Sequence, residues 1–129
     1  MRYLGIDFGS KRVGVAVSDE SNSFAFPLVV LPNSPNLIDE IKKIFIDYNI
    51  GEIVIGDSKD FAQIENEIMK EIRPFVVLLK KELNVTISLH PEFLSSLEAK
   101  QLQGKNTMLD ASAAAIILKS FLDTKNNKK

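Results

Sequence analysis

Apolar and polar positions alternate along residues 2–8 as they do in a strand with one buried face. Leu4, Ile6 and Phe8 fall on one face of this predicted strand, while the opposite face carries the carboxylate of Asp7. An ionised side chain inside an apolar strand costs several kcal/mol unless it is paired or bound to a metal. The pattern therefore predicts a strand and marks one position in it as a candidate for chemistry.

A second alternating run, residues 11–19, follows the dipeptide Gly9-Ser10, which is a turn signal between strands. Valines at every second position predict one bulky face, and the residues between them predict one small face. The two runs predict a β-hairpin in which small neighbours leave room around Asp7.

The rest of the chain reads as alternating strands and helices. We expect strands at 23–31, 52–57 and 84–90. We expect helices at 37–48, from 64 to 83, from about 95, and from about 107 to about 122. Pro27 predicts an edge position or a bulge in the third strand, and Pro74 predicts a kink or a break near Arg73. The element order indicates an α/β domain with a five-stranded mixed sheet and helices on both faces.

Composition limits the class of protein. The chain has 129 residues, 45% of them hydrophobic and 26% charged, which is ordinary for one soluble domain. We expect that domain at 1–123, followed by a polar tail at 124–129. The chain has no cysteine, no signal-peptide pattern and no apolar run that could cross a bilayer, so we expect a cytoplasmic protein that does not bind membranes. The net charge of −1 argues against a broad basic surface but allows a local basic patch.

Four acidic residues are candidates for a site, and each has an alternative explanation. Asp7 could instead pair across the hairpin with Lys11 or Arg12. Glu92 follows the fifth strand, where open α/β sheets bind ligands, but could be an ordinary loop glutamate. Asp57 ends the fourth strand and is a candidate fourth acid, or it simply initiates the next loop.

Asp110 stands at the start of the last predicted helix. Together with Thr107 it fits a capping box, which explains its position without any catalytic role. The small residues 111–115 nevertheless allow this helix to approach the sheet closely and to bring Asp110 near the strand carboxylates. Ser95 and Glu98 form another capping box, which explains Glu98 fully.

Carboxylates from separate elements, in a chain without cysteine and with a single histidine, describe a hard oxygen site suited to Mg²⁺ or Mn²⁺. Two such ions can activate water and stabilise the leaving oxygen of a phosphodiester displacement. The single histidine, His90, is interpreted as a packing or positioning residue, with a proton shuttle as the alternative.

The stretch "LGIDFGSKRVGVAVSD" at 4–19 resembles the opening strand pair of the YqgF/RuvX family, which are Holliday-junction-resolvase-like nucleases of the RNase H-like superfamily. "EIVIG" at 52–56, "HPEFLSSLEA" at 90–99 and "DASAAAIILKSFLD" at 110–123 resemble later segments of that family, so the resemblance spans about residues 1–123.

The resemblance implies an RNase H-like fold and a nuclease that processes the 5′ end of precursor 16S rRNA, with Holliday junctions as another substrate of the family. It places the family's acidic residues on Asp7, Glu92 and Asp110, and its basic strand-pair residues on Lys11 and Arg12. The acidic positions are those that the residue patterns single out independently.

The chain departs from the family at three places. Pro91-Glu92-Phe93 replaces the usual Asp-Glu-Arg, so an arginine that could hold a phosphate bidentately is missing. "GDSKDFAQ" replaces a Gly-x-Pro loop, and the shortened stretch before the last helix leaves Lys100 and Lys105 to contact phosphate.

The leading hypothesis is a metal-dependent endonuclease that acts on structured nucleic acid with two Mg²⁺ or Mn²⁺ ions, as a monomer or weak homodimer. One alternative is a nucleic-acid-binding module without catalysis, and another is a Holliday-junction resolvase in DNA recombination and repair. A third is ATP binding of the actin/hexokinase type, because "DFGS" at 7–10 fits the Asp-x-Gly-[Ser/Thr] phosphate loop. That class, however, uses two RNase H-like domains, and this chain supplies one.

Overall fold

The structure is a computed structural model that describes residues 1–9, 11–57, 67–91 and 109–126. At 57, 67–71, 91, 109–110 and 126 it describes the backbone alone. None of the helices in these ranges is long and apolar enough to span a membrane.

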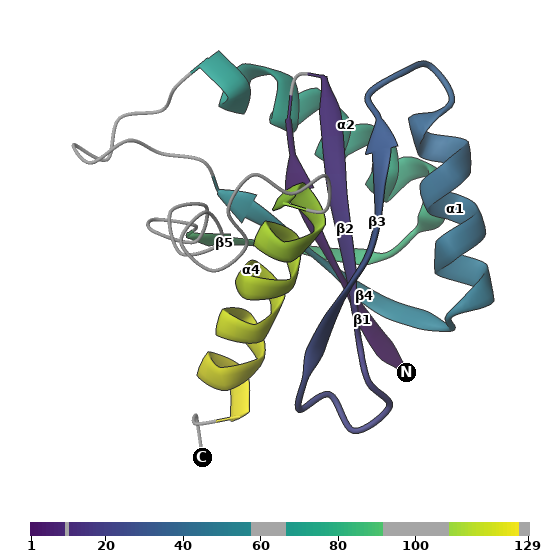
Figure 1. The fold of residues 1–129 in the computed structure, drawn as a ribbon. Coiled ribbons are helices and arrows are strands. Elements are labelled where there is room, and N and C mark those ends of the chain that lie inside the picture. The colour runs from purple at the N-terminus through teal and green to yellow at the C-terminus, as the bar shows by residue number, and fades with distance from the viewer. Residues whose placement is uncertain (10, 58–66, 92–108, 127–129) are drawn as a thin grey trace.

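Five strands form one mixed sheet in the order β3-β2-β1-β4-β5 (Figure 1). In chain order the elements are β1 (Arg2–Phe8), β2 (Arg12–Ser18), β3 (Ala25–Pro32), α1 (Leu37–Asp47), β4 (Ile50–Asp57), α2 (Glu67–Leu83), β5 (Thr86–Pro91) and α4 (Leu109–Asn126). β2 is antiparallel to both β1 and β3, whereas β1, β4 and β5 run parallel. The predicted five-stranded mixed sheet is confirmed.

The larger hydrophobic core lies between the sheet and the helices α1 and α2. It contains Leu4, Ile6 and Phe8 of β1, which share one face of the strand as the alternation predicted. Fully buried Ile41 of α1 and Leu79 of α2 close it from the helix side. Burial of these side chains is the main term that stabilises this half of the fold.

The opposite face of the sheet carries α4, so helices cover both faces as predicted (Figure 1). Here the strands present small side chains. The residues of α4 at 111–115, which are alanines and one serine, are also small, and all of them are buried. A Cβ added to Gly5 would stand 2.8 Å from the Cβ of Leu118 and 3.0 Å from the carbonyl oxygen of Ala114. The helix therefore approaches the sheet as closely as the small residues suggested.

The third strand has both features that Pro27 predicted. β3 lies at an edge of the sheet, and its register with β2 shifts between Val15 and Ala16, which pair with Val29 and Pro27. Leu28 is the extra residue of this irregularity, and an edge position lets the missing N–H of proline face away from the ladder.

Of the kink or break expected near Arg73, the break is absent, and the end expected for the last helix is wrong. Pro74 lies inside α2, which continues unbroken from Glu67 to Leu83, because burial of Ile72 and Phe75 on one face outweighs the lost backbone hydrogen bond. The last helix ends at Asn126 instead of near Leu122, so the first residues of the predicted tail are helical.

Candidate active site

Asp7 lies near the carboxyl end of β1, on the face of the sheet that α4 covers. Two residues apart on this face, Tyr3 packs against Phe121 with ring centroids 5.7 Å apart, and Gly5 meets Leu118. Alternation along the strand puts Asp7 next in this row, where it is half-buried and pairs across the ladder with Gly14. Its neighbour in β2 is thus the smallest residue available.

The N-terminal half of α4 lies on the side of the sheet where β1 ends at Asp7 and Phe8. The helix runs antiparallel to β1, since Phe121 meets Tyr3 and the earlier residue Leu118 meets Gly5. Two further strand residues cover about 6.8 Å, which corresponds to four or five helical residues. Counted back from Leu118, that step leads to Ala113 or Ala114, so the backbone of Asp110 lies about one helical turn further toward the start of α4. The side chain of Asp110 lies outside the described residues.

The carboxyl ends of β1, β4 and β5 meet at the same edge of the sheet because the three strands run parallel. Asp57, the last residue of β4, pairs in register with Pro91, the last residue of β5. Glu92 comes next in the sequence and lies outside the described residues, as do Lys100 and Lys105. The backbone therefore brings three of the predicted acidic positions to one edge and leads directly to the fourth.

The donor chemistry at this edge fits a hard cation. The sequence has no cysteine, and Asp7 offers a half-buried carboxylate beside glycine on a strand end. Among the side chains that the structure describes, no three acidic or histidine groups converge on one point, and those of Glu92 and Asp110 are not among them. A site for Mg²⁺ or Mn²⁺ at this edge would use oxygen donors, and of the predicted acids the structure describes the side chain of Asp7 and the backbone of Asp57 and Asp110.

His90 is held by α4 and packs as expected. Its Nε2 lies 2.9 Å from the hydroxyl oxygen of Ser120, and its ring stands edge-on to Phe121 at 5.9 Å. Partial burial lowers the pKa of the imidazole, which favours the neutral ring. These contacts explain His90 as a residue that joins β5 to α4.

Two basic side chains follow Asp7 on the β1–β2 hairpin. Lys11 and Arg12 are both exposed. The turn is tight, since a Cβ added to Gly9 would stand 2.5 Å from the carbonyl oxygen of Arg12, and only glycine fits there. The hairpin therefore presents two cations within five residues of the strand-end carboxylate.

Asn33, which the sequence patterns did not single out, holds this hairpin from the β3–α1 connection. Its side-chain Nδ2 donates a hydrogen bond to the carbonyl oxygen of Gly9 at 2.8 Å. Its backbone N–H donates to the carbonyl oxygen of Lys11 at 2.9 Å. No local periodicity signals such a contact, because the partners are more than twenty residues apart in the chain.

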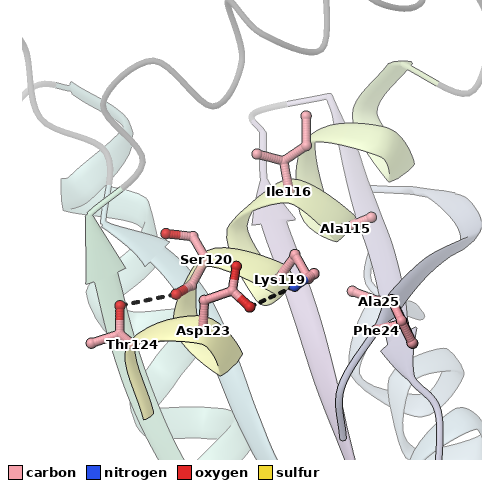
Figure 2. A pocket seen from close by; sticks show the side chains of 8 residues that line it. All are labelled: Phe24, Ala25, Ala115, Ile116, Lys119, Ser120, Asp123 and Thr124. Atoms are coloured by element: carbon pink, nitrogen blue, oxygen red, sulfur yellow. Dashed lines mark hydrogen bonds and ion pairs between the residues drawn. The ribbon is translucent and has the colours of Figure 1, made fainter. Parts of the chain in front are cut away.

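A separate pocket of about 560 Å³ lies on the outer side of α4, beside the start of β3 (Figure 2). Its charged groups, Lys119 and Asp123, form an ion pair at 2.5 Å, and the Lys119 ammonium stands 5.8 Å from the ring centroid of Phe24. The adjoining strand residue Ala25 pairs with Ser18, at the end of β2 remote from Asp7. This pocket is thus distinct from the strand-end site.

The sheet order, the helix α4 across it and the acidic strand ends define an α/β protein of the RNase H-like class. The solved structure of Thermus thermophilus RuvC in complex with a Holliday junction substrate has the same fold, with a TM-score of 0.64, 17% identity, and coverage of 98% of this chain and 97% of that one. The chain belongs to the RuvX family, described as Holliday junction resolvase, which it matches over residues 1–124.

Relatives match over nearly the whole chain. The "Putative pre-16S rRNA nuclease" of Mycoplasma mobile is 38% identical over 136 residues, which cover 95% of this chain and 92% of that protein. The protein of the same name from Thermoanaerobacter pseudethanolicus is 32% identical over 139 residues, covering 99% and 100%. These full-length matches favour a one-domain nuclease family over the two-domain ATP-binding alternative.

Proposed function

We propose that this protein is a metal-dependent endonuclease that hydrolyses phosphodiester bonds in structured nucleic acid and processes the 5′ end of precursor 16S rRNA during ribosome biogenesis. The observation that carries the proposal is the position of Asp7, on the α4 face at the edge where β1, β4 and β5 end and α4 begins. The name shared by the relatives from Mycoplasma mobile and Thermoanaerobacter pseudethanolicus supports the choice of substrate.

In this proposal Asp7, Glu92 and Asp110 are the catalytic carboxylates and hold two Mg²⁺ or Mn²⁺ ions, with Asp57 as a candidate fourth ligand. When bound, such ions supply Lewis acidity for an attacking water and for the leaving oxygen of the scissile bond. The contribution of this chain is to fix the carboxylates on a rigid strand end and a helix start, so that little reorganisation is needed during the reaction.

Lys11, Arg12, Lys100 and Lys105 are proposed to bind backbone phosphates on either side of the cleaved bond. Lys11 and Arg12 are exposed and follow the strand that carries Asp7. With a net charge of −1, the chain has no general attraction for nucleic acid, so a local cluster of cations must supply it.

The proposed setting is the cytoplasm, where the chain would act on nucleic acid, as a monomer or weak homodimer and without a membrane partner. One RNase H-like domain, residues 1–123, would carry both the metal ligands and the phosphate contacts.

Branched DNA is the second candidate substrate, because the family is described as Holliday junction resolvase. A nucleic-acid-binding role without catalysis is the third candidate, favoured by Phe93 at the position where the family commonly has an arginine. Both are decided by the experiment that tests the main proposal.

That experiment offers the purified protein a precursor 16S rRNA with its 5′ extension and, in parallel, a four-way DNA junction, in the presence of Mg²⁺, Mn²⁺ or EDTA. We expect cleavage of the RNA with either ion and none with EDTA. The Asp7→Asn variant should cleave at least about 100-fold more slowly. Asp47→Asn is the matched control, since Asp47 is an exposed carboxylate at the end of α1, on the opposite face of the sheet.

Cleavage of the four-way junction but not of the precursor rRNA would identify branched DNA, in place of rRNA, as the substrate. Metal-independent binding without cleavage of either substrate would favour the third candidate, a nucleic-acid-binding role without catalysis. An Asp7→Asn variant as active as Asp47→Asn would remove Asp7 from the site.

A further inference from the structure

We infer that Asn33 is a positioning residue that holds the phosphate-binding segment of the β1–β2 hairpin in place. The inference rests on the proposed function, because it assigns Asn33 a task in binding nucleic acid through Lys11 and Arg12. Asn33 itself need not touch the substrate.

The first support is that one residue makes two hydrogen bonds to one short turn. The Nδ2 group of Asn33 donates to the carbonyl oxygen of Gly9 at 2.8 Å, and its backbone N–H donates to the carbonyl oxygen of Lys11 at 2.9 Å. The two acceptors lie on either side of residue 10. Both ends of the turn are therefore tied to the same residue of another connection.

The second support is the position of Asn33 in the sheet. It directly follows Pro32, which pairs in register with Arg12 across the β2–β3 ladder. Asn33 is half-buried, so its hydrogen bonds compete less with water than those of an exposed side chain would. The ladder and the two hydrogen bonds together fix where the chain leaves β1 and where it enters β2.

The third support is the kind of side chain that the turn presents. Lys11 and Arg12 are long, exposed and rich in rotamers, and ordering each of them on a phosphate costs up to about 2 kcal/mol. A turn whose backbone also moved would add to that cost on every binding event. Holding the backbone before the substrate arrives lowers the cost of binding, which is the general effect of preorganisation.

The expected signature is weaker substrate binding with an unchanged rate for the bound complex. Asn33→Ala should raise KM and Kd on the order of tenfold and leave kcat nearly as it is, since Asp7 stays in place. The slope of log Kd against log salt should fall by about one to two, because each lost phosphate contact removes about one unit.

The experiment measures Kd for the precursor rRNA against salt concentration, together with KM and kcat, in Asn33→Ala and in Asn36→Ala. Asn36 is the matched control, since it lies on the same connection, is exposed and makes no side-chain capping hydrogen bond. Asn33→Asp is the second variant, which keeps the size and shape of the side chain and replaces the Nδ2 donor by an acceptor oxygen. Thermal unfolding of each variant separates loss of fold from loss of binding.

A double-mutant cycle with Lys11→Ala and Arg12→Ala tests the mechanism directly. If Asn33 acts through these two cations, adding Asn33→Ala to the Lys11→Ala/Arg12→Ala variant should weaken binding no further. Full additivity would overturn the inference, as would variants of Asn33 that bind like Asn36→Ala. A wild-type protein that binds no nucleic acid overturns the proposed function and this inference with it. Normal wild-type binding that Asn33 variants leave unchanged overturns the inference alone.

Discussion

Gly5 of β1 and Leu118 of α4 are in such close contact that a Cβ on Gly5 would stand 2.8 Å from the Cβ of Leu118. The backbone of the same helix is also close, because the carbonyl oxygen of Ala114 would be 3.0 Å away. This contact sets the distance between the helix and the sheet, and both Asp7 and Asp110 lie beyond it toward the edge of the sheet where β1 ends and α4 begins. Packing and the proposed chemistry therefore depend on the same small residue.

Gly5→Ala is expected to destabilise the protein by about 1–3 kcal/mol, because the added methyl group pushes α4 away from β1. Cleavage should fall by more than the unfolded fraction explains, since Asp110 moves with the helix. Denaturant unfolding and cleavage assays on the same preparation measure the two effects. Gly51→Ala is the control, where the new Cβ would stand equally close to the sulfur of Met1, a flexible and exposed side chain. Equal losses in both variants would contradict the prediction.

Asn84, directly after α2, is expected to tolerate glycine and to reject valine. Its φ of 50° is left-handed, and its N–H donates to the carbonyl oxygen of Lys80 at 2.9 Å, which closes the helix. Asn84→Val should lower the free energy of unfolding by about 1–2 kcal/mol, whereas Asn84→Gly should leave it within about 0.5 kcal/mol. Thr86→Val is the control, an exposed position in β5 where a β-branched residue fits. Asn84→Val as stable as Thr86→Val would contradict the assignment.

Asp19 is expected to stabilise the β2–β3 turn only while it is ionised. The hydrogen bond from the Ser21 hydroxyl, helped by the backbone N–H groups of Phe24 and Ser23, holds the pKa of the carboxyl below its ordinary value. A carboxylate whose pKa is lowered in the folded state contributes stability above the unfolded pKa, and that contribution disappears as the pH falls through the folded pKa.

The difference in melting temperature between wild type and Asp19→Asn should therefore be present at pH 6 and shrink below about pH 4. Glu20→Gln serves as the control for loss of a neighbouring negative charge. A difference that stays constant from pH 6 to pH 3 would show that the ionised form of Asp19 is not what the turn requires.

Mg²⁺ or Mn²⁺ is expected to raise the melting temperature of the wild-type protein, because a ligand that binds only the folded state stabilises it in proportion to the logarithm of its concentration over Kd. Asp7→Asn should show little or no rise, while Asp47→Asn should respond like the wild type. Differential scanning fluorimetry against metal concentration, with EDTA as the blank, makes the comparison. A rise of equal size in Asp7→Asn would contradict its assignment as a ligand.

The order of most elements, and the face of the sheet to which their side chains point, could be predicted from the sequence because local patterns encode both. Alternation alone separated Leu4 and Ile6, which enter the core under α1 and α2, from Gly5, which meets α4. Because proline has no backbone N–H, Pro27 was expected at an edge or a bulge, and β3 is an edge strand with an irregular register. Asp7 was recognisable because an acid in such a strand needs a reason to be there.

Tertiary structure decided what depends on neighbours that are remote in the chain. α2 continues through Pro74 because its apolar face is buried on the sheet, a gain that no local propensity contains. Asn33 donates a hydrogen bond to the carbonyl oxygen of Gly9, which lies 24 positions earlier in the chain, and no periodicity links the two residues. The sequence by itself determined the strands, their faces and the candidate acids, since these follow from short-range alternation and side-chain chemistry. Which strand ends share an edge, and how closely α4 approaches them, was decided by packing between segments that meet only in the folded state.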